Sequence, residues 1–239
     1  PAGGVVGMIA AGATDGPRRL IGFDMGGTST DVSLSTGDIP RRFAAEIDGV
    51  RLQTPMVDIT TIAAGGGSVL RFADRRLQVG PASAGADPGP ACYRRNGPAT
   101  ITDCNVVLGR IPVEHFPHVF GPTGDQPIDP AASRAQLAEL ATAAHEEAGL
   151  EYSVEALAEA FLQVACARMA NAIRELALHH GEDPARFGLL SFGGAAGQHA
   201  CAVADVASWL AHAIARNGAA IDLRAVEAAA LLHDVDKIP

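Results

Sequence analysis

The sequence lacks long apolar runs, paired cysteines and basic clusters, and each absence excludes a class of protein. No run approaches the ~20 apolar residues that a helix needs to span a bilayer, so we expect no membrane partner. The chain does not open with the basic, apolar and small-residue segments of a secretory signal. We therefore expect a cytoplasmic protein.

Basic residues are few and scattered, since 18 Lys and Arg stand against 27 Asp and Glu, for a formal net charge of −9. This balance provides no electrostatic surface for phosphate backbones, so we expect no nucleic-acid partner and favour a small molecule. The cysteines Cys92, Cys104, Cys166 and Cys201 form no C-x-x-C pair. Neither a zinc knuckle nor a disulfide framework is indicated, and we expect reduced, semi-buried thiols.

Glycine is abundant in the first two-thirds of the chain, and alanine-rich helical periodicity follows from about Pro130. This change predicts an α/β domain followed by helices. Residues 20–35 are expected to form a strand, a glycine turn and a second strand, and residues 57–72 a second hairpin of the same design. Residues 79–110 are expected to be mostly ordered loop before a short strand at 100–102.

The helical part has clear boundaries in the sequence. Asp129 followed by Pro130 is expected to cap a first helix, and a second helix is expected over about residues 153–180, ended by Gly181. Residues 187–192 (FGLLSF) are typical of a buried strand, and a double glycine and another helix follow them. This order brings backbone N–H groups and a helix N-terminus to one point, which suits ligand binding.

The segment DMGGTSTD, from Asp24 to Asp31, is the most informative motif. Gly26 and Gly27 let backbone amides approach an anion, Thr28 and Ser29 add hydroxyl donors, and Asp24 can hold a hydrated Mg²⁺. The alternative is a tight hairpin whose threonines cap the turn. Likewise, the turn after residue 192 could accept adenine or ribose against bare backbone, or it could be a close strand–helix packing turn.

GFDMGGTSTDVSL at 22–34 resembles the second phosphate hairpin of the actin, heat-shock-chaperone and sugar-kinase superfamily, and LLSFGGAAGQHA at 189–200 resembles its adenosine motif. More closely, the chain resembles the hydantoinase A/5-oxoprolinase family in order and spacing over about residues 1–202. The segments that carry this resemblance are PAGGVVG, GFDMGGTSTDVS, VDITTIAAGGGSV, VGPASAGADPGPACYRRNGPATITDCNVVLGR and LLSFGGAAGQHACA. It implies one lobe of an actin-like (ribonuclease-H-like) ATPase fold of class α/β, with glycine-rich hairpins, followed by C-terminal helices.

The resemblance further implies an ATP-dependent cyclic-amide hydrolase that converts 5-oxo-L-proline, ATP and water to L-glutamate, ADP and phosphate. The sequences SFGGAAGQHACA and DCN (103–105) favour the 5-oxoprolinase branch of the family over its acetone-carboxylase-like relatives. Phosphorylation of the amide oxygen makes the carbonyl carbon electrophilic and so opens a ring that otherwise resists water. Asp24 would act beside the γ-phosphate through Mg²⁺ and water. The expected ATP contacts are Gly26, Gly27, Thr28, Ser29, Gly193 and Gly194.

The same resemblance implies further site residues. The expected catalytic set also contains Asp58 and Asp103. The expected substrate cleft is lined by Thr60, Gly65, Gly66, Gly67, Ser68 and Asn105. Two alternatives stay open: the glycines of this cleft could be structural residues of a bulged hairpin, and Asp103 could be a polar residue of an ordered loop.

The resemblance implies partners as well. The upstream D-x-G-G-T hairpin of a first lobe is absent, and both ends, at Pro1 and Pro239, look cut. We expect residues 1–202 to be a partial nucleotide-binding lobe that needs an N-terminal lobe and a hydantoinase-B-like subunit or domain. An apolar face left exposed would favour a homo-oligomer. The alternatives are a non-catalytic nucleotide-binding fragment or a hydantoinase subunit acting on hydantoins.

Residues 203–239 resemble the opening of an HD-type metal phosphohydrolase domain. The metal ligands would be His199, His233 and Asp234, because a histidine and a His-Asp pair on a later helix hold the metal in that family. The alternative is a polar helix end. If the HD interpretation holds, the chain is a chimera with a junction near His199.

Overall fold

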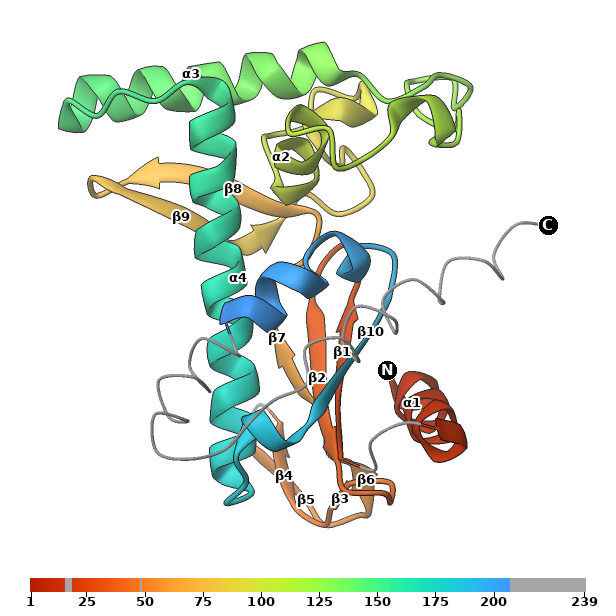
Figure 1. The fold of residues 1–239 in the computed structure, drawn as a ribbon. Helices are drawn as coiled ribbons and strands as arrows, with labels where there is room; N and C mark the ends of the chain where they lie inside the picture. The colour runs from red at the N-terminus through yellow and green to blue at the C-terminus, as the bar shows by residue number, and fades with distance from the viewer. Residues whose placement is uncertain (16–18, 48, 207–239) are drawn as a thin grey trace. The chain divides into compact units, whose positions relative to one another are not determined.

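The computed structural model describes residues 1–15, 19–47 and 49–206 (Figure 1). Its chain divides into two compact units, which are described separately. Unit 1 contains Pro1–Asp24, Asp31–Ile62 and the described residues from Ala170 onward. Unit 2 contains Met25–Thr30 and Ala63–Met169. The fold is mixed α/β, as the sequence predicts.

Unit 1 is built on a four-stranded sheet in the order β10-β1-β2-β7. Its strands are β1 (Leu20–Met25), β2 (Thr30–Ser35), β7 (Thr60–Ile62) and β10 (Gly188–Phe192). The expected hairpin of residues 20–35 is confirmed, and so is the strand before the double glycine. β1 and β10 are parallel, although the chain between them is long. Because both strands run the same way, their carboxyl ends lie at the same edge of the sheet.

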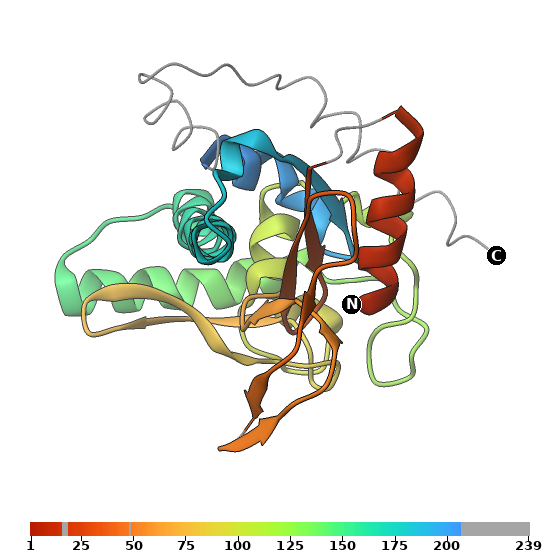
Figure 2. The same cartoon turned by 90° about the horizontal axis from the view of Figure 1, so that it is seen from below.

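Helix α1 (Ala2–Asp15), which sequence patterns did not foresee, packs beside this sheet (Figure 2). Val5 and Met8 of α1 form a buried cluster with Leu20 and Phe192. A Cβ on Gly4 would collide with the Phe192 ring, so a residue with a side chain would force this ring to move. Unit 1 is completed by two short two-stranded ladders of β3 (Arg41–Arg42) with β6 (Met56–Val57) and β4 (Ala45–Ile47) with β5 (Val50–Leu52).

Unit 2 contains the antiparallel hairpin of β8 (Ser68–Ala73) and β9 (Arg76–Ser83). Asp74 and Arg75 turn this hairpin with positive φ angles of 52° and 58°. The prediction of a second hairpin across residues 57–72 is therefore wrong. The strands on the two sides of the triple glycine belong to different sheets, because β7 pairs within the large sheet and β8 pairs with β9.

Helix α2 (Ile101–Val107) replaces the short strand expected at 100–102. Thr100 is its N-cap and forms a capping box with Asp103, so the β-branched residues at its start satisfy a helix terminus. A 3₁₀ turn, η1 (Ala91–Tyr93), precedes it. Three more 3₁₀ turns follow along the described chain: η2 (Val113–His115), η3 (Pro184–Arg186) and η4 (Ala196–Gln198).

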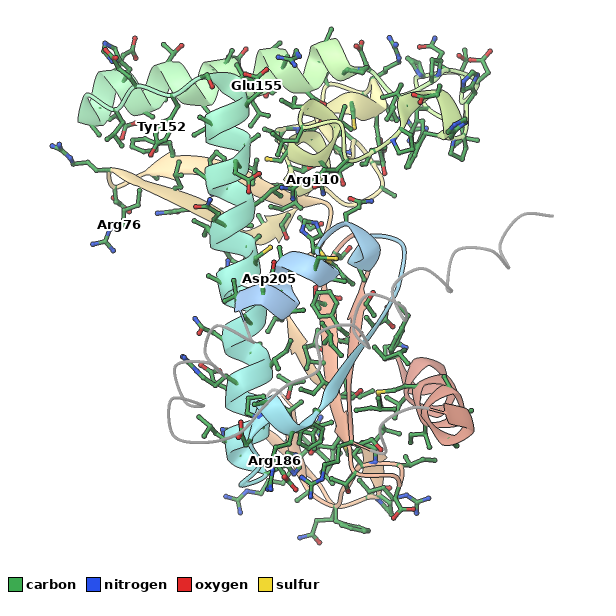
Figure 3. All side chains as sticks on the ribbon, viewed as in Figure 1. Arg76, Arg110, Tyr152, Glu155, Arg186 and Asp205 are labelled. Carbon is green, nitrogen blue, oxygen red and sulfur yellow. The ribbon has the colours of Figure 1, made fainter. Side chains whose placement is uncertain are left out.

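The two expected long helices are confirmed as α3 (Pro130–Ala148) and α4 (Val154–His179). The Asp129 side chain accepts hydrogen bonds from the first amides of α3, as the sequence predicts. At the start of α4, Glu155 receives the Arg134 guanidinium of α3 at 2.7 Å; Figure 3 labels Glu155. Within the described parts of the chain, no helix has the length and apolar character that crossing a membrane requires.

Candidate functional site

Asp24 lies at the carboxyl end of β1, where its partner across the parallel ladder is Phe192 of β10. Both strands are followed directly by glycines, at Gly26 on one side and Gly193 on the other. Ligand sites of open α/β sheets form outside the carboxyl ends of the strands, where backbone amides are left without ladder partners. The register thus puts the Asp24 carboxylate at the edge of the sheet that is suited to a ligand.

The segment Met25–Thr30 forms a tight turn, which we call the glycine loop. The Gly26 N–H donates to the Ser29 carbonyl at 3.0 Å, so this amide stabilises the turn instead of remaining available for a phosphate. Gly27 and Thr28 are exposed, and their amides donate to no backbone carbonyl among the described residues. These two amides, with the hydroxyls of Thr28 and Ser29, are the donors of the loop that an anion could use.

The glycines themselves show whether a ligand would fit. Apart from the glycine itself and its two chain neighbours, no described residue has an atom within 4 Å of a Cβ added to Gly27, Gly194 or Gly197, and the nearest such atom to a Cβ on Gly26 is at 3.8 Å. Packing within the described chain therefore does not require glycine at these positions. Open space over a glycine backbone is what a phosphate or a nucleoside occupies when it lies against the main chain. Gly193 differs, because its φ of +93° requires glycine for the turn itself.

Residues 63–68, which we call the clamp segment, lie against the glycine loop within unit 2. Gly66 N–H donates to the Gly26 carbonyl at 3.0 Å, and Gly67 N–H donates to the Gly27 carbonyl at 2.6 Å. All four predicted cleft residues from Gly65 to Ser68 are buried. The nearest atoms to a Cβ on Gly65 or Gly67 are backbone atoms of the glycine loop. These residues therefore hold the loop and do not line the open cleft that the sequence predicts.

The catalytic candidate Asp103 is also fully buried, at the start of α2. Its carboxylate accepts five hydrogen bonds, from the amides of Ala91, Cys92 and Thr100 and from the hydroxyls of Thr100 and Ser133, at 2.7–3.1 Å. Donors on both oxygens stabilise the buried carboxylate where it stands. This environment supports a positioning role. Asp103 belongs to helix α2, and not to the ordered loop of the alternative interpretation. Asn105 is likewise fully buried.

The buried carboxylate affects the thiols around it. Burial raises the pKa of Cys92 and of Cys104 well above the usual range of a thiol, and the Asp103 charge raises both further. Burial also raises the pKa of Cys166, to about 11. Among the four cysteines, these three are buried free thiols and Cys201 is exposed. The expectation of reduced cysteines is in keeping with this arrangement.

The structure does not bring Asp58 to Asp24. Asp58 Oδ2 lies 2.9 Å from His180 Nε2, and Oδ1 lies 3.8 Å from the Arg42 guanidinium. The Asp58 N–H donates to the Pro40 carbonyl, beyond the end of β2. Because β1 and β2 form a hairpin, the end of β2 lies opposite the edge that carries Asp24. Thr60, a cleft candidate, is half-buried on the edge strand β7.

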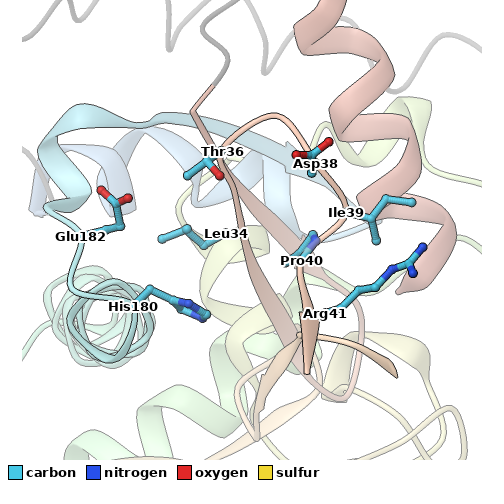
Figure 4. A pocket seen from close by; sticks show the side chains of 8 residues that line it. All are labelled: Leu34, Thr36, Asp38, Ile39, Pro40, Arg41, His180 and Glu182. Carbon is cyan, nitrogen blue, oxygen red and sulfur yellow. The ribbon is translucent and has the colours of Figure 1, made fainter. Parts of the chain in front are cut away.

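His180 and Glu182 border a cavity of about 330 Å³ in unit 1, together with Leu34 of β2 (Figure 4). Two of the ionisable residues that line this cavity have ion-pair partners. His180 contacts Asp58, and Glu182 receives the Arg19 guanidinium at 2.5 Å. Asp38 and Arg41 add one charge of each sign to the wall, so its net charge selects no single ligand class.

Of the three proposed HD-type ligands, His199 lies within the described part of the chain. His199 is fully buried just after η4, and its carbonyl accepts the Val203 amide at 2.9 Å. His233 and Asp234 lie outside the described residues. Among the residues that the structure describes, no group of three or more His, Cys, Asp or Glu side chains is placed to hold a metal ion.

Sequence reasoning missed two polar side chains that connect these features. Thr102 donates to the Gly66 carbonyl, and Ser133 donates to Asp103. The T-x-x-D spacing of Thr100 and Asp103 is a capping-box pattern and could have revealed α2. The pairing of α2 with the clamp segment depends on tertiary structure and has no sequence signal of its own.

Residues 1–230 match the family described as Hydantoinase/oxoprolinase, and the match passes the expected boundary at residue 202 without supporting an HD-type domain. The 5-oxoprolinase PfmaA of Pestalotiopsis fici is 46% identical over 86% of this chain and 16% of its own length. The 5-oxoprolinase 1 of Arabidopsis thaliana is 45% identical over 85% of this chain and 17% of its own length.

A solved structure shares the fold. The ATP-dependent caprolactamase from Pseudomonas jessenii superposes with a TM-score of 0.70 and 31% identity, over 86% of this chain and 29% of that one. The chain thus spans about a sixth of the length of the two curated relatives and under a third of this structural neighbour.

Proposed function

The chain belongs to the hydantoinase/oxoprolinase family, and from this membership we propose that it supplies a nucleotide-binding part of an ATP-dependent cyclic-amide hydrolase of the 5-oxoprolinase type. The observation that carries the proposal is the pair of glycine turns that follow the adjacent parallel strands β1 and β10, with Asp24 at the end of one of them. Open space above Gly27 and Gly194 is the observation that fits a nucleotide.

In this proposal the exposed amides of Gly27 and Thr28 bind phosphate oxygens, with the hydroxyls of Thr28 and Ser29 as further donors. Asp24 holds Mg²⁺ through water, since a hard cation prefers oxygen ligands and often keeps part of its hydration shell. Gly193 and Gly194 take the adenosine. The nucleotide supplies a phosphoryl group that activates the amide oxygen of the lactam for attack by water.

Two relatives that carry the name 5-oxoprolinase support 5-oxoproline as the substrate, with hydantoins as the alternative. The protein lobes and subunits that complete the reaction centre are proposed partners, because the chain spans only 16% of the first relative. A second candidate function follows from the same fact: the chain alone binds Mg·ATP and does not turn it over, because a phosphate held from one side lacks preorganised electrostatic stabilisation.

One experiment separates these candidates. Isothermal titration of the 239-residue chain with Mg·ATP is paired with an assay for glutamate released from 5-oxoproline. Binding with glutamate release supports the hydrolase for this chain alone, and binding without release supports the binding module. No binding would overturn both.

The control for the site is a pair of glycine variants. Gly27→Ala should lower the affinity for Mg·ATP about tenfold or more, because the added methyl group occupies the open space above the loop. Gly7→Ala on the exposed face of α1 adds a methyl group that also meets no described atom, and it should leave the affinity unchanged.

A further inference from the structure

We propose that Thr102 is a positioning residue that fixes the glycine loop through the backbone of Gly66. The inference rests on the proposed function for its ligand, Mg·ATP, but the structural connection stands within unit 2. Thr102 lies in the first turn of α2, far along the chain from the loop that it would control.

The connection is a series of short hydrogen bonds. The Thr102 amide and the Thr102 hydroxyl both donate to the Gly66 carbonyl, at 2.8 and 2.9 Å. The Gly66 amide in turn donates to the Gly26 carbonyl at 3.0 Å. Two donors on one carbonyl leave it little freedom to rotate, because both of its lone pairs are engaged. The Gly66 carbonyl belongs to the same peptide unit as the Gly67 amide, which donates to the Gly27 carbonyl at 2.6 Å. The orientation of this peptide unit is therefore set by α2 on one side and transmitted to the glycine loop on the other.

The start of α2 is itself held firmly. Asp103 accepts both the amide and the hydroxyl of Thr100, and it also binds the amides of η1 and the Ser133 hydroxyl of α3. A buried carboxylate with five donors resists displacement, because a lost contact leaves a buried charge partly unsatisfied. Thr102 is thus anchored next to a rigid junction of three elements, which gives Asp103 an indirect role in the site.

The glycine loop needs such support. Its central residues Gly26 and Gly27 have no side chains to restrict them, and the loop's own turn is closed by the Gly26 to Ser29 hydrogen bond. Glycine loses more conformational freedom than any other residue when it becomes ordered. A loop that became ordered only when an anion bound would therefore have a lower affinity for that anion. A loop held in place beforehand avoids this cost.

The test compares Thr102→Val, Thr102→Ser and Thr142→Val in the 239-residue chain. Valine keeps the shape of threonine and removes the hydroxyl donor, whereas serine retains the donor. Thr142 is the matched control, since its hydroxyl donates to the Ala138 carbonyl on the exposed side of α3. The first readout is amide hydrogen exchange of residues 25–30 and 65–67 without nucleotide. The second is Mg·ATP affinity.

We expect faster exchange in both segments and about fivefold weaker Mg·ATP binding for Thr102→Val, the loss of roughly one hydrogen bond. Thr102→Ser should restore both quantities, and Thr142→Val should match the wild type in both. Unchanged exchange at 25–30 in Thr102→Val would overturn the inference. If exchange rises but the wild-type chain binds no nucleotide, the structural connection stands, and the proposed function and the positioning role for ATP fail together.

Discussion

A Cβ placed on Gly65 would lie 2.7 Å from the carbonyl oxygen of Gly27, closer than real Cβ atoms come to backbone. Such a Cβ would also meet the Ser29 amide nitrogen at 2.7 Å. The clamp segment and the glycine loop are therefore in direct main-chain contact. Glycine at 65 is required by its neighbours, whereas glycine at 27 is not.

Gly65→Ala should accordingly lower the free energy of unfolding by about 1–3 kcal/mol, because neither backbone segment can yield without losing hydrogen bonds. It should also weaken Mg·ATP binding by displacing the loop. Urea unfolding and nucleotide titration measure the two effects. Gly7→Ala provides the control, and equal stability of the two variants would contradict the close approach of the segments.

Two carboxylate variants can distinguish the roles of Asp24 and Asp58, which lie at opposite ends of the large sheet. Asp24→Asn should weaken binding of Mg·ATP markedly, since it removes the charge proposed to hold the hydrated cation. Asp58→Asn should leave that affinity unchanged, because Asp58 contacts His180 and Arg42 at the opposite end. Asp58→Asn should lower the free energy of unfolding by less than about 1 kcal/mol, as expected for a partly exposed ion pair. Loss of binding in Asp58→Asn would restore the expectation that it acts with Asp24.

Asp103 should be far more important for stability than an exposed carboxylate. Asp103→Asn should lower the free energy of unfolding by about 3 kcal/mol, because an amide cannot accept all five hydrogen bonds and brings two donors of its own. Asp125→Asn is the matched control, since this exposed residue accepts a hydrogen bond from Thr123. Its effect should stay within about 0.5 kcal/mol. Urea midpoints that agree for the two variants would refute the anchoring role.

The buried thiols predict a pH dependence. Burial raises the pKa of Cys166 from its ordinary value of 9.0 to about 11, so the folded chain favours the protonated thiol. The resulting stabilisation is present below the pKa of the unfolded thiol and is lost as pH rises through the folded value. We expect the unfolding free energy to fall between about pH 9 and 11. Cys166→Ala should reduce the slope of this decline, measured by urea unfolding at each pH.

A labelling experiment checks the same burial. At about pH 8, a thiol reagent should modify Cys201 first in the native chain, because it is exposed and the other three thiols are buried. Denaturant should make all four accessible. Rapid native labelling of Cys92 would show that the junction around Asp103 opens readily.

Local sequence signals predicted the elements that depend on local chemistry. The alternation around Gly26 and Gly27 indicated β1 and β2, Asp129 indicated the start of α3, and Gly181 indicated the end of α4. Each depends on a turn, a cap or a left-handed residue close by in the chain. The strand expected at 100–102 was wrong because β-branched residues also suit an N-cap turn, where Asp103 completes the capping box.

The sequence by itself determined the family, the two glycine turns and the position of Asp24 beside one of them, because these are encoded in contiguous residues. Tertiary structure decided what the other candidates do. In the folded chain Gly65 to Ser68 are buried against the glycine loop, Asp103 accepts hydrogen bonds from buried amides and hydroxyls, and Asp58 contacts His180. These outcomes depend on which segments meet after folding, and a pattern of polar residues cannot distinguish a side chain that faces a ligand from one that holds the backbone beneath it.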